Sequence, residues 1–301
     1  MRGKKNPPLD LTPVPDDAPV TFDTMATRYL QDYQLQRYRS LVTARARVEH
    51  LRGFFGGWRA AAITAASVRT YQLLRRKQGM ESATVNRETS ALSRMFHLAM
   101  RLEHLERMPL FPKRLEENPP RDGFFEHEEY VKVRAHLPAA YQDVLDFAYY
   151  SGWRRNEILE LTWDDVDLSG GVVRLTPRRS KTRTGRVLPI STPLQLVLTR
   201  RLQRRQLGDP RVFRRDDVPV RTWRSALRDA CRKARVPHRL LHDCRRTAAR
   251  NLVRAGVPER VAMLLTGHKT RAVFDRYNIV NEQELLTAGE RLAAYVAKRG
   301  A

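Results

Sequence analysis

The feature that most constrains the fold is the segment KRLEENPPRDG at residues 113–123, which contains two adjacent prolines and no apolar periodicity. Such a segment does not continue a helix or a strand, because proline lacks a backbone N–H and restricts the residue before it. It also balances three basic with three acidic residues. We interpret it as a linker between two domains, and the chain of 301 residues is long enough for two hydrophobic cores.

The sequence before the linker predicts a helical domain. Residues 1–20 hold five prolines and balanced charges, which is typical of a disordered arm. Residues 21–112 carry apolar side chains at helical spacing, interrupted by glycines. Thr21 is placed to cap the first helix. We therefore expect a small helical bundle. Because it has fifteen basic and seven acidic residues, we expect it to bind DNA.

Residues 124–301 predict a domain in which helices surround a small sheet. Two short apolar segments with flanking turn residues predict two strands joined by a basic loop. The strand residues are Val172, Val173 and Leu175, then Val187, Leu188 and Ile190. Helices are predicted on both sides, and the last of them is an amphipathic C-terminal helix. The whole chain is expected to be mainly α with a small β-sheet, an α+β fold.

The net charge of +23 at pH 7 predicts a polyanionic partner, above all double-stranded DNA. Both domains are basic and the linker is neutral, so two positive lobes on a joint are expected to close around a duplex. A solvated basic surface and the arginine bias of a GC-rich genome stay open as alternatives. The predicted DNA-binding residues are Arg75, Arg76, Lys77, Arg178, Arg179, Arg183 and Arg186.

Cysteine content and hydropathy indicate the compartment. Two cysteines, Cys231 and Cys244, favour a reducing environment without a disulfide framework. The N-terminal residues lack the apolar core of a signal peptide, and no apolar run reaches membrane-spanning length. We expect a cytoplasmic, nucleoid-associated protein without a membrane partner.

Two patterns that could bind metal ions fail on their spacing. Residues 165–176 begin like a calcium loop, but the twelfth position is Thr176 where a bidentate glutamate is required. Four possible zinc ligands lack the paired spacing of a zinc finger. These are Cys231, His238, His242 and Cys244. We therefore expect neither a metal nor another cofactor.

Chemistry on a phosphodiester without a metal needs cations, a nucleophile and an acid. The second domain offers all three in short motifs: SGWRRNEIL, the loop RRSKTRTGR, LHDCRRT and TGHKTRAVFDRYN. Arginine suits the cationic role because its planar guanidinium binds two phosphate oxygens and stays charged. The candidate site residues are Arg154, Glu157, Lys181, His242, Arg245, His268 and Tyr277.

This ordered set resembles the tyrosine recombinase (phage integrase) family. The matching segments are Gly152-Trp153-Arg154-Arg155-Asn156-Glu157, Lys181, His242-Asp243-Cys244-Arg245, and Leu265-Thr266-Gly267-His268 through Tyr277. The first domain is similar to the family's core-binding domain, mostly in LSRMFHLAMRLEHLERMP. The resemblance covers about residues 20–295. It implies a helical core-binding domain followed by a mixed α/β catalytic domain.

The resemblance implies that the phosphate is held by arginines and attacked by a phenol. Arg154 and Arg245 would clamp the non-bridging oxygens of the scissile phosphate. Tyr277 would attack phosphorus, form a 3′-phosphotyrosyl bond and free a 5′-hydroxyl. Lys181 would protonate that leaving oxygen, and among the cations of its loop only a lysine readily gives up a proton.

Three further residues have supporting roles in the family pattern. His242 would assist the proton transfer that involves Tyr277. His268 would donate a hydrogen bond to the phosphate. Glu157 would support the arginine site without transferring a proton.

The resemblance implies a site-specific recombinase that acts as four protomers on two duplexes, with accessory DNA-bending proteins as further partners. Integration or excision of a mobile element is the preferred use, and chromosome-dimer resolution stays open. The C-terminal helix, with Leu285, Leu292 and Val296 on one side, would dock on its own domain or on a neighbouring protomer. A non-catalytic DNA-binding regulator and a type IB topoisomerase-like enzyme remain alternatives.

Overall fold

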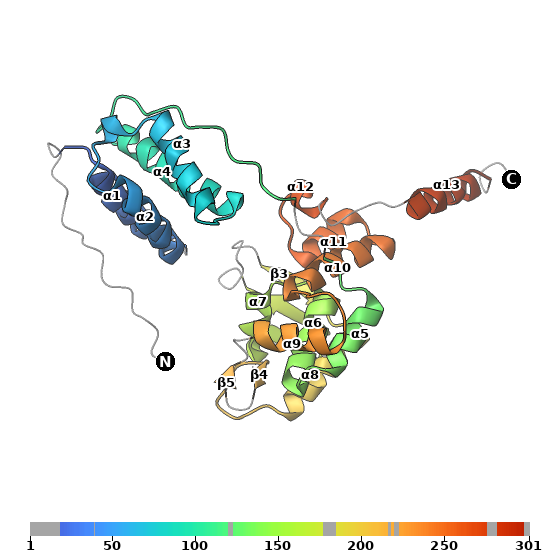
Figure 1. The fold of residues 1–301 in the computed structure, drawn as a ribbon. Helices are drawn as coiled ribbons and strands as arrows, with labels where there is room; N and C mark the ends of the chain where they lie inside the picture. The colour runs from blue at the N-terminus through green and yellow to red at the C-terminus, as the bar shows by residue number, and fades with distance from the viewer. Residues whose placement is uncertain are drawn as a thin grey trace. The chain divides into compact units, whose positions relative to one another are not determined.

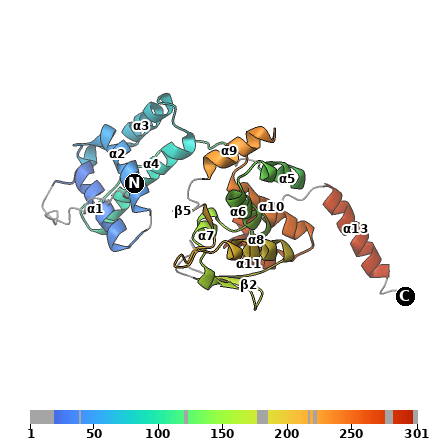
Figure 2. The same cartoon turned by 90° about the horizontal axis from the view of Figure 1, so that it is seen from below.

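The computed structural model describes residues 19–38, 40–119, 123–176, 185–215, 218–219, 223–275 and 282–297. The chain divides into two compact units, Met1–Pro120 and Arg121–Ala301, shown from two directions in Figure 1 and Figure 2. Each unit has a hydrophobic core of its own. Most of the predicted N-terminal arm, residues 1–20, lies outside the described residues.

The described part of the first unit is helical (Figure 1). Its elements are α1 (Phe22–Leu35), α2 (Leu41–Phe55), the 3₁₀ turn η1 (Ala60–Ala62), α3 (Ala65–Lys77) and α4 (Ser82–Arg101). The long helix α4 packs against each of the other three α-helices. The described residues of the predicted linker, 113–119 and 123, form neither helix nor strand.

Local hydrogen bonds and aromatic packing explain this helical bundle. The predicted cap is confirmed, because Thr21 Oγ1 accepts the backbone N–H of Thr24 at 3.2 Å and Thr24 Oγ1 accepts that of Thr21 at 2.9 Å. The core contains fully buried aromatic and aliphatic side chains from all four helices, such as Tyr29, Phe55 and Tyr71. Such burial supplies the main driving force for folding of the unit.

The described part of the second unit surrounds one central helix, α6 (Ala139–Ser151). It packs against α5 (His127–Ala135), α7 (Arg155–Leu159), α8 (Thr192–Gln203) and α10 (Leu241–Arg254). The remaining helical elements are η2 (Trp163–Asp165), α9 (Arg224–Lys233), α11 (Glu259–Thr266), α12 (Arg271–Phe274) and α13 (Glu282–Ala297). None of the helices in the described ranges is long and apolar enough to cross a bilayer.

A three-stranded antiparallel sheet lies in the same unit, in the order β1 (Val166–Asp167), β2 (Val172–Leu175) and β3 (Arg186–Pro189). The two predicted strands are confirmed as β2 and β3, although Ile190 lies just beyond the end of β3. The sequence did not predict β1 or the short pair β4 (Arg214–Arg215) and β5 (Val218–Pro219), because two residues show no alternation. The expected fold class, mainly α with a small sheet, is confirmed.

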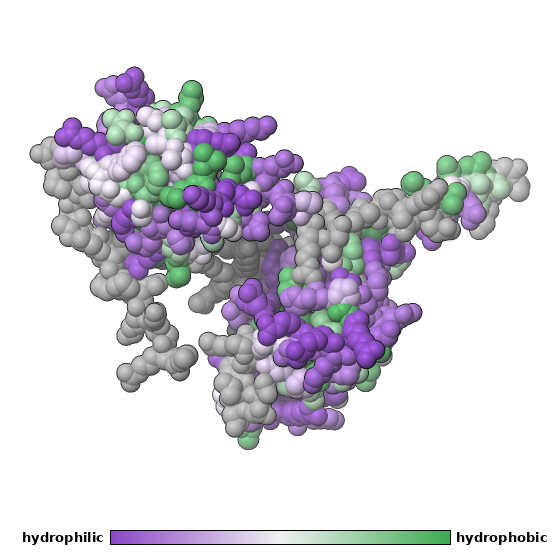
Figure 3. Space-filling model, viewed as in Figure 1, coloured by the Kyte–Doolittle hydropathy of each residue, from purple (hydrophilic) through white to green (hydrophobic). Residues whose placement is uncertain are grey.

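The helix α13 confirms the predicted C-terminal helix. All its described side chains are exposed, and Leu285, Leu292 and Val296 are among them. Figure 3 shows hydrophobic surface, in green, on this helix. The apolar face of α13 is therefore not part of a core formed by the described residues.

Candidate active site

Arg154 lies between two helices at a sharp change of chain direction. The helix α6 ends at Gly152, whose φ of 63° is left-handed, and α7 begins immediately after Arg154. Glu157, one turn into α7, accepts the backbone N–H of Arg154 at 2.9 Å and its Nη1 at 3.0 Å. The carboxylate therefore fixes both the backbone and the guanidinium of Arg154.

Glycine is required at position 152 by conformation and by space. A Cβ added there would lie 2.8 Å from Ala248 Cβ and 3.1 Å from Thr266 Cγ2. We predict that Gly152→Ala lowers the free energy of unfolding by about 2–4 kcal/mol, because left-handed strain adds to steric overlap. Urea unfolding followed by tryptophan fluorescence measures this change, since three of the four tryptophans lie in this unit.

A matched control for Gly152→Ala is Gly53→Ala in α2. No heavy atom lies within 4 Å of a Cβ built at Gly53. Alanine favours a helix interior over glycine by up to about 1 kcal/mol, so this variant should be neutral or more stable. Equal stability changes in the two variants would contradict the packing argument.

Arg245 occupies the second turn of α10 and is almost fully buried, with 2% of the residue exposed. Its Nη1 donates to the carbonyl oxygen of Gly152 at 2.9 Å and to that of Thr266. His242, one turn earlier, is exposed at the start of the same helix. Asp243 fixes this helix start, because its Oδ2 accepts the backbone N–H of Leu240 at 2.8 Å.

His268 follows the end of α11, where Gly267 adopts a left-handed φ of 72°. Its ring is buried and packs against Phe274, with 5.5 Å between the ring centroids. The Nδ1 atom lies 2.8 Å from Thr266 Oγ1. Arg154 Nη2 donates to the carbonyl oxygen of Gly267 at 3.0 Å.

The turn at residues 266–267 therefore brings the two arginines together. Arg154 binds one carbonyl of this turn and Arg245 binds the other, while Arg245 also binds Gly152, two residues before Arg154. Three segments that are distant in sequence meet at this point. The arrangement concentrates positive charge that can stabilise a phosphate.

Desolvation and this positive charge together lower the pKa of the neighbouring imidazoles. Burial, followed by the charges of Arg245 and Arg154, lowers the pKa of His268 to about 3. Desolvation, followed by the charges of Arg245 and Arg246, lowers the pKa of His242, although its side chain keeps contact with solvent. A neutral imidazole donates through one nitrogen and accepts through the other, so both rings can take part in proton transfer or hydrogen bonding at neutral pH.

The low pKa of His268 predicts a dependence of stability on pH. The folded protein keeps this ring neutral down to about pH 3, whereas the unfolded chain protonates it below about pH 6.5. The stabilisation is therefore fully present above pH 6.5 and decreases as the pH falls toward 3. We predict that the unfolding free energy of His268→Gln falls less steeply than that of the unchanged protein as the pH decreases from about 6.5 to 5. The two slopes should differ by roughly 1 kcal/mol per pH unit. Urea titrations of both proteins measure the difference, and parallel curves would exclude it.

Several predicted residues lie outside the described residues. These are Arg178, Arg179, Lys181, Arg183 and Tyr277. In sequence, the first four fall between β2 and β3, and Tyr277 falls two positions after Asp275, where the described segment ends. The structure therefore brings together Arg154, Arg245 and His268 with Glu157, and it places His242 on the same helix as Arg245.

Two predicted DNA-binding residues are turned inward, which the sequence did not indicate. Arg75 donates to buried Glu88 at 2.9 Å and 2.8 Å through two nitrogens. Arg186 pairs with buried Glu157, and only 7% of its side chain is exposed. Their guanidinium groups satisfy buried carboxylates, and these ion pairs would compete with a contact to DNA. Arg76 and Lys77 are exposed, as a DNA contact requires.

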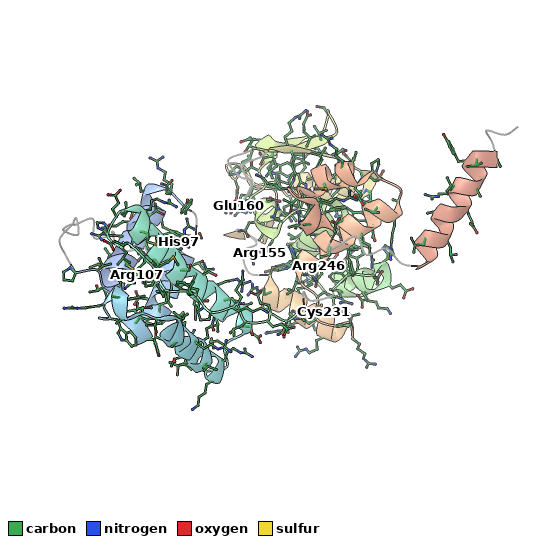
Figure 4. The ribbon with its side chains drawn as sticks, turned by 90° about the horizontal axis from the view of Figure 1, so that it is seen from above. His97, Arg107, Arg155, Glu160, Cys231 and Arg246 are labelled. Atoms are coloured by element: carbon green, nitrogen blue, oxygen red, sulfur yellow. The ribbon has the colours of Figure 1, made fainter. Side chains whose placement is uncertain are left out.

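A small cavity beside His242 was not predicted from the sequence. Its volume is about 200 Å³, and its lining includes Arg155, Arg224 and His238 with the apolar side chains of Trp223 and Leu227. Figure 4 labels Arg155 of α7 and Arg246 of α10 among the side chains of the second unit. The cavity was not predictable, because its residues come from three separate segments of the chain.

The described residues contain no group of three or more histidine, cysteine or acidic side chains that could hold a metal ion. The two cysteines are buried thiols. Burial raises the pKa of both, Cys231 and Cys244, so each favours the neutral form.

Comparison with known proteins gives this cluster of basic residues a family context. Residues 124–284 match the model of the phage integrase family. The chain belongs to the phage integrase family. The resemblance found in the sequence is confirmed, and with it the classification as a tyrosine-type site-specific recombinase.

Curated relatives agree with this assignment. The chain is 25% identical over 284 residues to tyrosine recombinase XerC from Chromobacterium violaceum, covering 87% of this chain and 91% of the relative. It is 27% identical over 152 residues to the integrase of Salmonella phage P22, covering 45% of this chain and 38% of that protein.

Solved structures share the fold at low sequence identity. The Tn1549 transposon integrase in complex with transposon right end DNA has a TM-score of 0.78 at 14% identity, covering 91% of this chain and 100% of that one. A lambda integrase dimer bound to a COC′ core site has a TM-score of 0.73 at 18% identity, covering 86% of this chain and 77% of that one. The fold of this phage integrase family member is thus that of DNA-bound integrases.

Proposed function

We propose that the protein cuts and rejoins the strands of double-stranded DNA at specific sites through a covalent 3′-phosphotyrosyl intermediate. The observation that carries this proposal is the convergence of Arg154 and Arg245 on the turn at residues 266–267. Two guanidinium groups held so close together can bind the non-bridging oxygens of one phosphodiester. We propose no metal ion and no nucleotide cofactor.

In the proposed reaction, the phenolic oxygen of Tyr277 attacks phosphorus. A bond forms between this oxygen and phosphorus, and the bond from phosphorus to the 5′ oxygen breaks. Free tyrosine has a pKa near 10, and the positive charge of Arg154, Arg245 and Lys181 favours its phenolate. Because one phosphoester replaces another, the 5′-hydroxyl of a second strand can reverse the step without ATP.

The remaining site residues manage protons and hydrogen bonds. Lys181 protonates the leaving 5′ oxygen. His242 accepts the proton of Tyr277, because a pKa lowered by desolvation and by neighbouring arginines keeps this ring neutral at neutral pH. His268 donates a hydrogen bond to the phosphate. Glu157 holds Arg154 in place through two hydrogen bonds.

We assign residues 21–112 to a core-binding domain and residues 124–301 to the catalytic domain, joined by the linker 113–123. The two compact units support this division. Of the predicted DNA contacts, Arg76 and Lys77 are candidates in the first domain, because both side chains are exposed. Arg178, Arg179 and Arg183 remain candidates in the second.

We propose that four protomers act on two duplexes, aided by accessory DNA-bending proteins. A lambda integrase tetramer bound to a Holliday junction shares the fold at a TM-score of 0.73. The exposed apolar residues of α13, including Leu285 and Leu292, supply a face that a neighbouring protomer can cover. The proposed biological use is integration or excision of a mobile element, in the cytoplasm and on the nucleoid.

A covalent adduct is the decisive test of this function. The protein is incubated with a nicked duplex that carries its site, identified by selection from random duplexes, and the products are separated on a denaturing gel. A DNA adduct and recombinant products support the proposal. Specific binding without an adduct would favour a DNA-binding regulator, and relaxation of arbitrary supercoiled plasmid without recombinants would favour a topoisomerase.

A further inference from the structure

A single buried carboxylate connects two arginines at the site. Glu157 is 3% exposed, and both of its oxygens are used. Its Oε1 accepts a hydrogen bond from Nη1 of Arg154. Its Oε2 accepts hydrogen bonds from the backbone N–H of Arg154 and from Nη2 of Arg186. Arg186 is the first residue of β3 and lies 29 residues from Glu157 in sequence. The strand therefore reaches the phosphate site through one ion pair.

Arg186 has two further contacts beside its ion pair with Glu157. Its guanidinium carbon lies 4.7 Å from the centroid of the Trp153 ring, which is a cation–π contact. A Cβ on Gly267 would overlap this guanidinium, so the turn that Arg154 contacts also packs on Arg186. Burial lowers the pKa of Arg186 and Glu157 opposes this shift, yet an arginine stays charged at neutral pH.

The charges of these three residues determine what the site offers to a phosphate. Arg154 and Glu157 alone form a neutral pair, in which the carboxylate competes with phosphate for the guanidinium. With Arg186 the set carries one net positive charge, and Glu157 divides its attraction between two cations. The side chain of Arg154 keeps 25% exposure while that of Arg186 keeps 7%, so Arg154 is the more open to a ligand of the two arginines that pair with Glu157.

We infer that Arg186 is a positioning residue that neutralises Glu157, so that Arg154 keeps its orientation and its full charge for the scissile phosphate. This inference rests on the proposed strand-transfer function. It assigns Arg186 to the interior of the catalytic site and gives Trp153 a role as the aromatic support of its guanidinium.

The test measures the rate of adduct formation on the nicked duplex at saturating protein, so that DNA affinity does not enter. Arg186→Met should slow the reaction roughly 100-fold, at the lower end of the loss for removal of one electrostatic group. Arg186→Lys keeps the charge and should stay within about 10-fold of the unchanged protein. In the double variant Glu157→Gln with Arg186→Met, the net positive charge of the three side chains returns to one. Its rate of adduct formation should therefore be about 10-fold higher than that of Arg186→Met.

A second substrate separates this electrostatic role from a purely structural one. A methylphosphonate at the scissile position lacks one negative oxygen and needs less cationic stabilisation. For at least one of its two diastereomers, the rate ratio between the unchanged protein and Arg186→Met should shrink to within about 3-fold. A misfolded site would instead keep the full loss on both substrates.

The outcomes distinguish this inference from the proposed function. An unchanged protein that forms an adduct, together with a fully active Arg186→Met, overturns the role of Arg186 alone. The role of Arg186 is also overturned if the rate loss of Arg186→Met is reduced neither in the double variant nor on the methylphosphonate substrate. If Arg186→Met does not fold, the double variant replaces it in the test, because it leaves no unpaired buried charge. A rate of adduct formation more than about 1,000-fold below that of the unchanged protein would then overturn the inference. No adduct with the unchanged protein overturns both.

Discussion

Replacing Tyr277 by phenylalanine is expected to remove the covalent DNA adduct and all recombinant products, a loss of at least about 10,000-fold in the rate of strand cleavage. Phenylalanine keeps the ring but lacks the oxygen that attacks phosphorus, and no other group in the proposed site can form the intermediate. DNA affinity should change by less than about 3-fold, because it depends on many phosphate contacts. A denaturing gel measures the adduct, and a mobility-shift titration measures binding.

The matched control for this variant is Tyr295→Phe in α13. Tyr295 is also a tyrosine of the C-terminal region, but 55% of it is exposed and it lies outside the motif that follows His268. This variant should form the adduct at an unchanged rate. An adduct that persists in Tyr277→Phe would show that another residue is the nucleophile and would end the assignment of Tyr277.

The second large effect is expected at Arg245. In Arg245→Ala the carbonyl oxygens of Gly152 and Thr266 lose a shared donor, and the phosphate loses a cation. We expect the rate of adduct formation to fall by roughly 1,000-fold, as for a lost transition-state donor. The free energy of unfolding should fall by about 2–4 kcal/mol, because buried carbonyls are left unsatisfied. Adduct kinetics and urea unfolding measure the two effects.

Two further variants separate charge from geometry at this position. Arg245→Lys keeps the charge, but a single ammonium does not reproduce the planar fork, so we expect an intermediate loss of roughly 100-fold. Arg174→Ala removes an arginine of β2 whose side chain is 57% exposed and pairs with Asp167 at the surface. It should leave stability within about 0.5 kcal/mol. Full activity of Arg245→Ala would exclude this residue from the phosphate site.

The sequence predicted the elements whose cause is local. Thr21 caps α1 through a residue three positions away, and the short apolar segments of β2 and β3 identify the larger part of the sheet. The strands β1, β4 and β5 have two residues each, so no pattern identifies them. The family was recognisable because four short motifs follow one another in a fixed order between residues 152 and 277, within the segment that matches the family model.

The sequence did not predict which arginines face inward. Arg75 and Arg186 stand in basic segments that look alike, yet each pairs with a buried glutamate, 13 and 29 residues away. A glutamate taken out of water requires a counter-charge, and the fold selects the cation that its packing brings within reach. Sequence spacing carries no such information when the partners lie on different elements.

The sequence by itself determined the chemical inventory of this protein: its helices, most of its sheet, its charge and the ordered set of basic residues with one tyrosine. Only the tertiary structure decided how part of that inventory is used. Arg154 and Arg245 meet because they bind carbonyls of one turn, 113 and 21 residues away in sequence. That meeting depends on the packing of α6, α10 and α11, in which the left-handed Gly152 permits close approach. Long-range packing, unlike a helix cap or a short apolar segment, is a property of the whole fold.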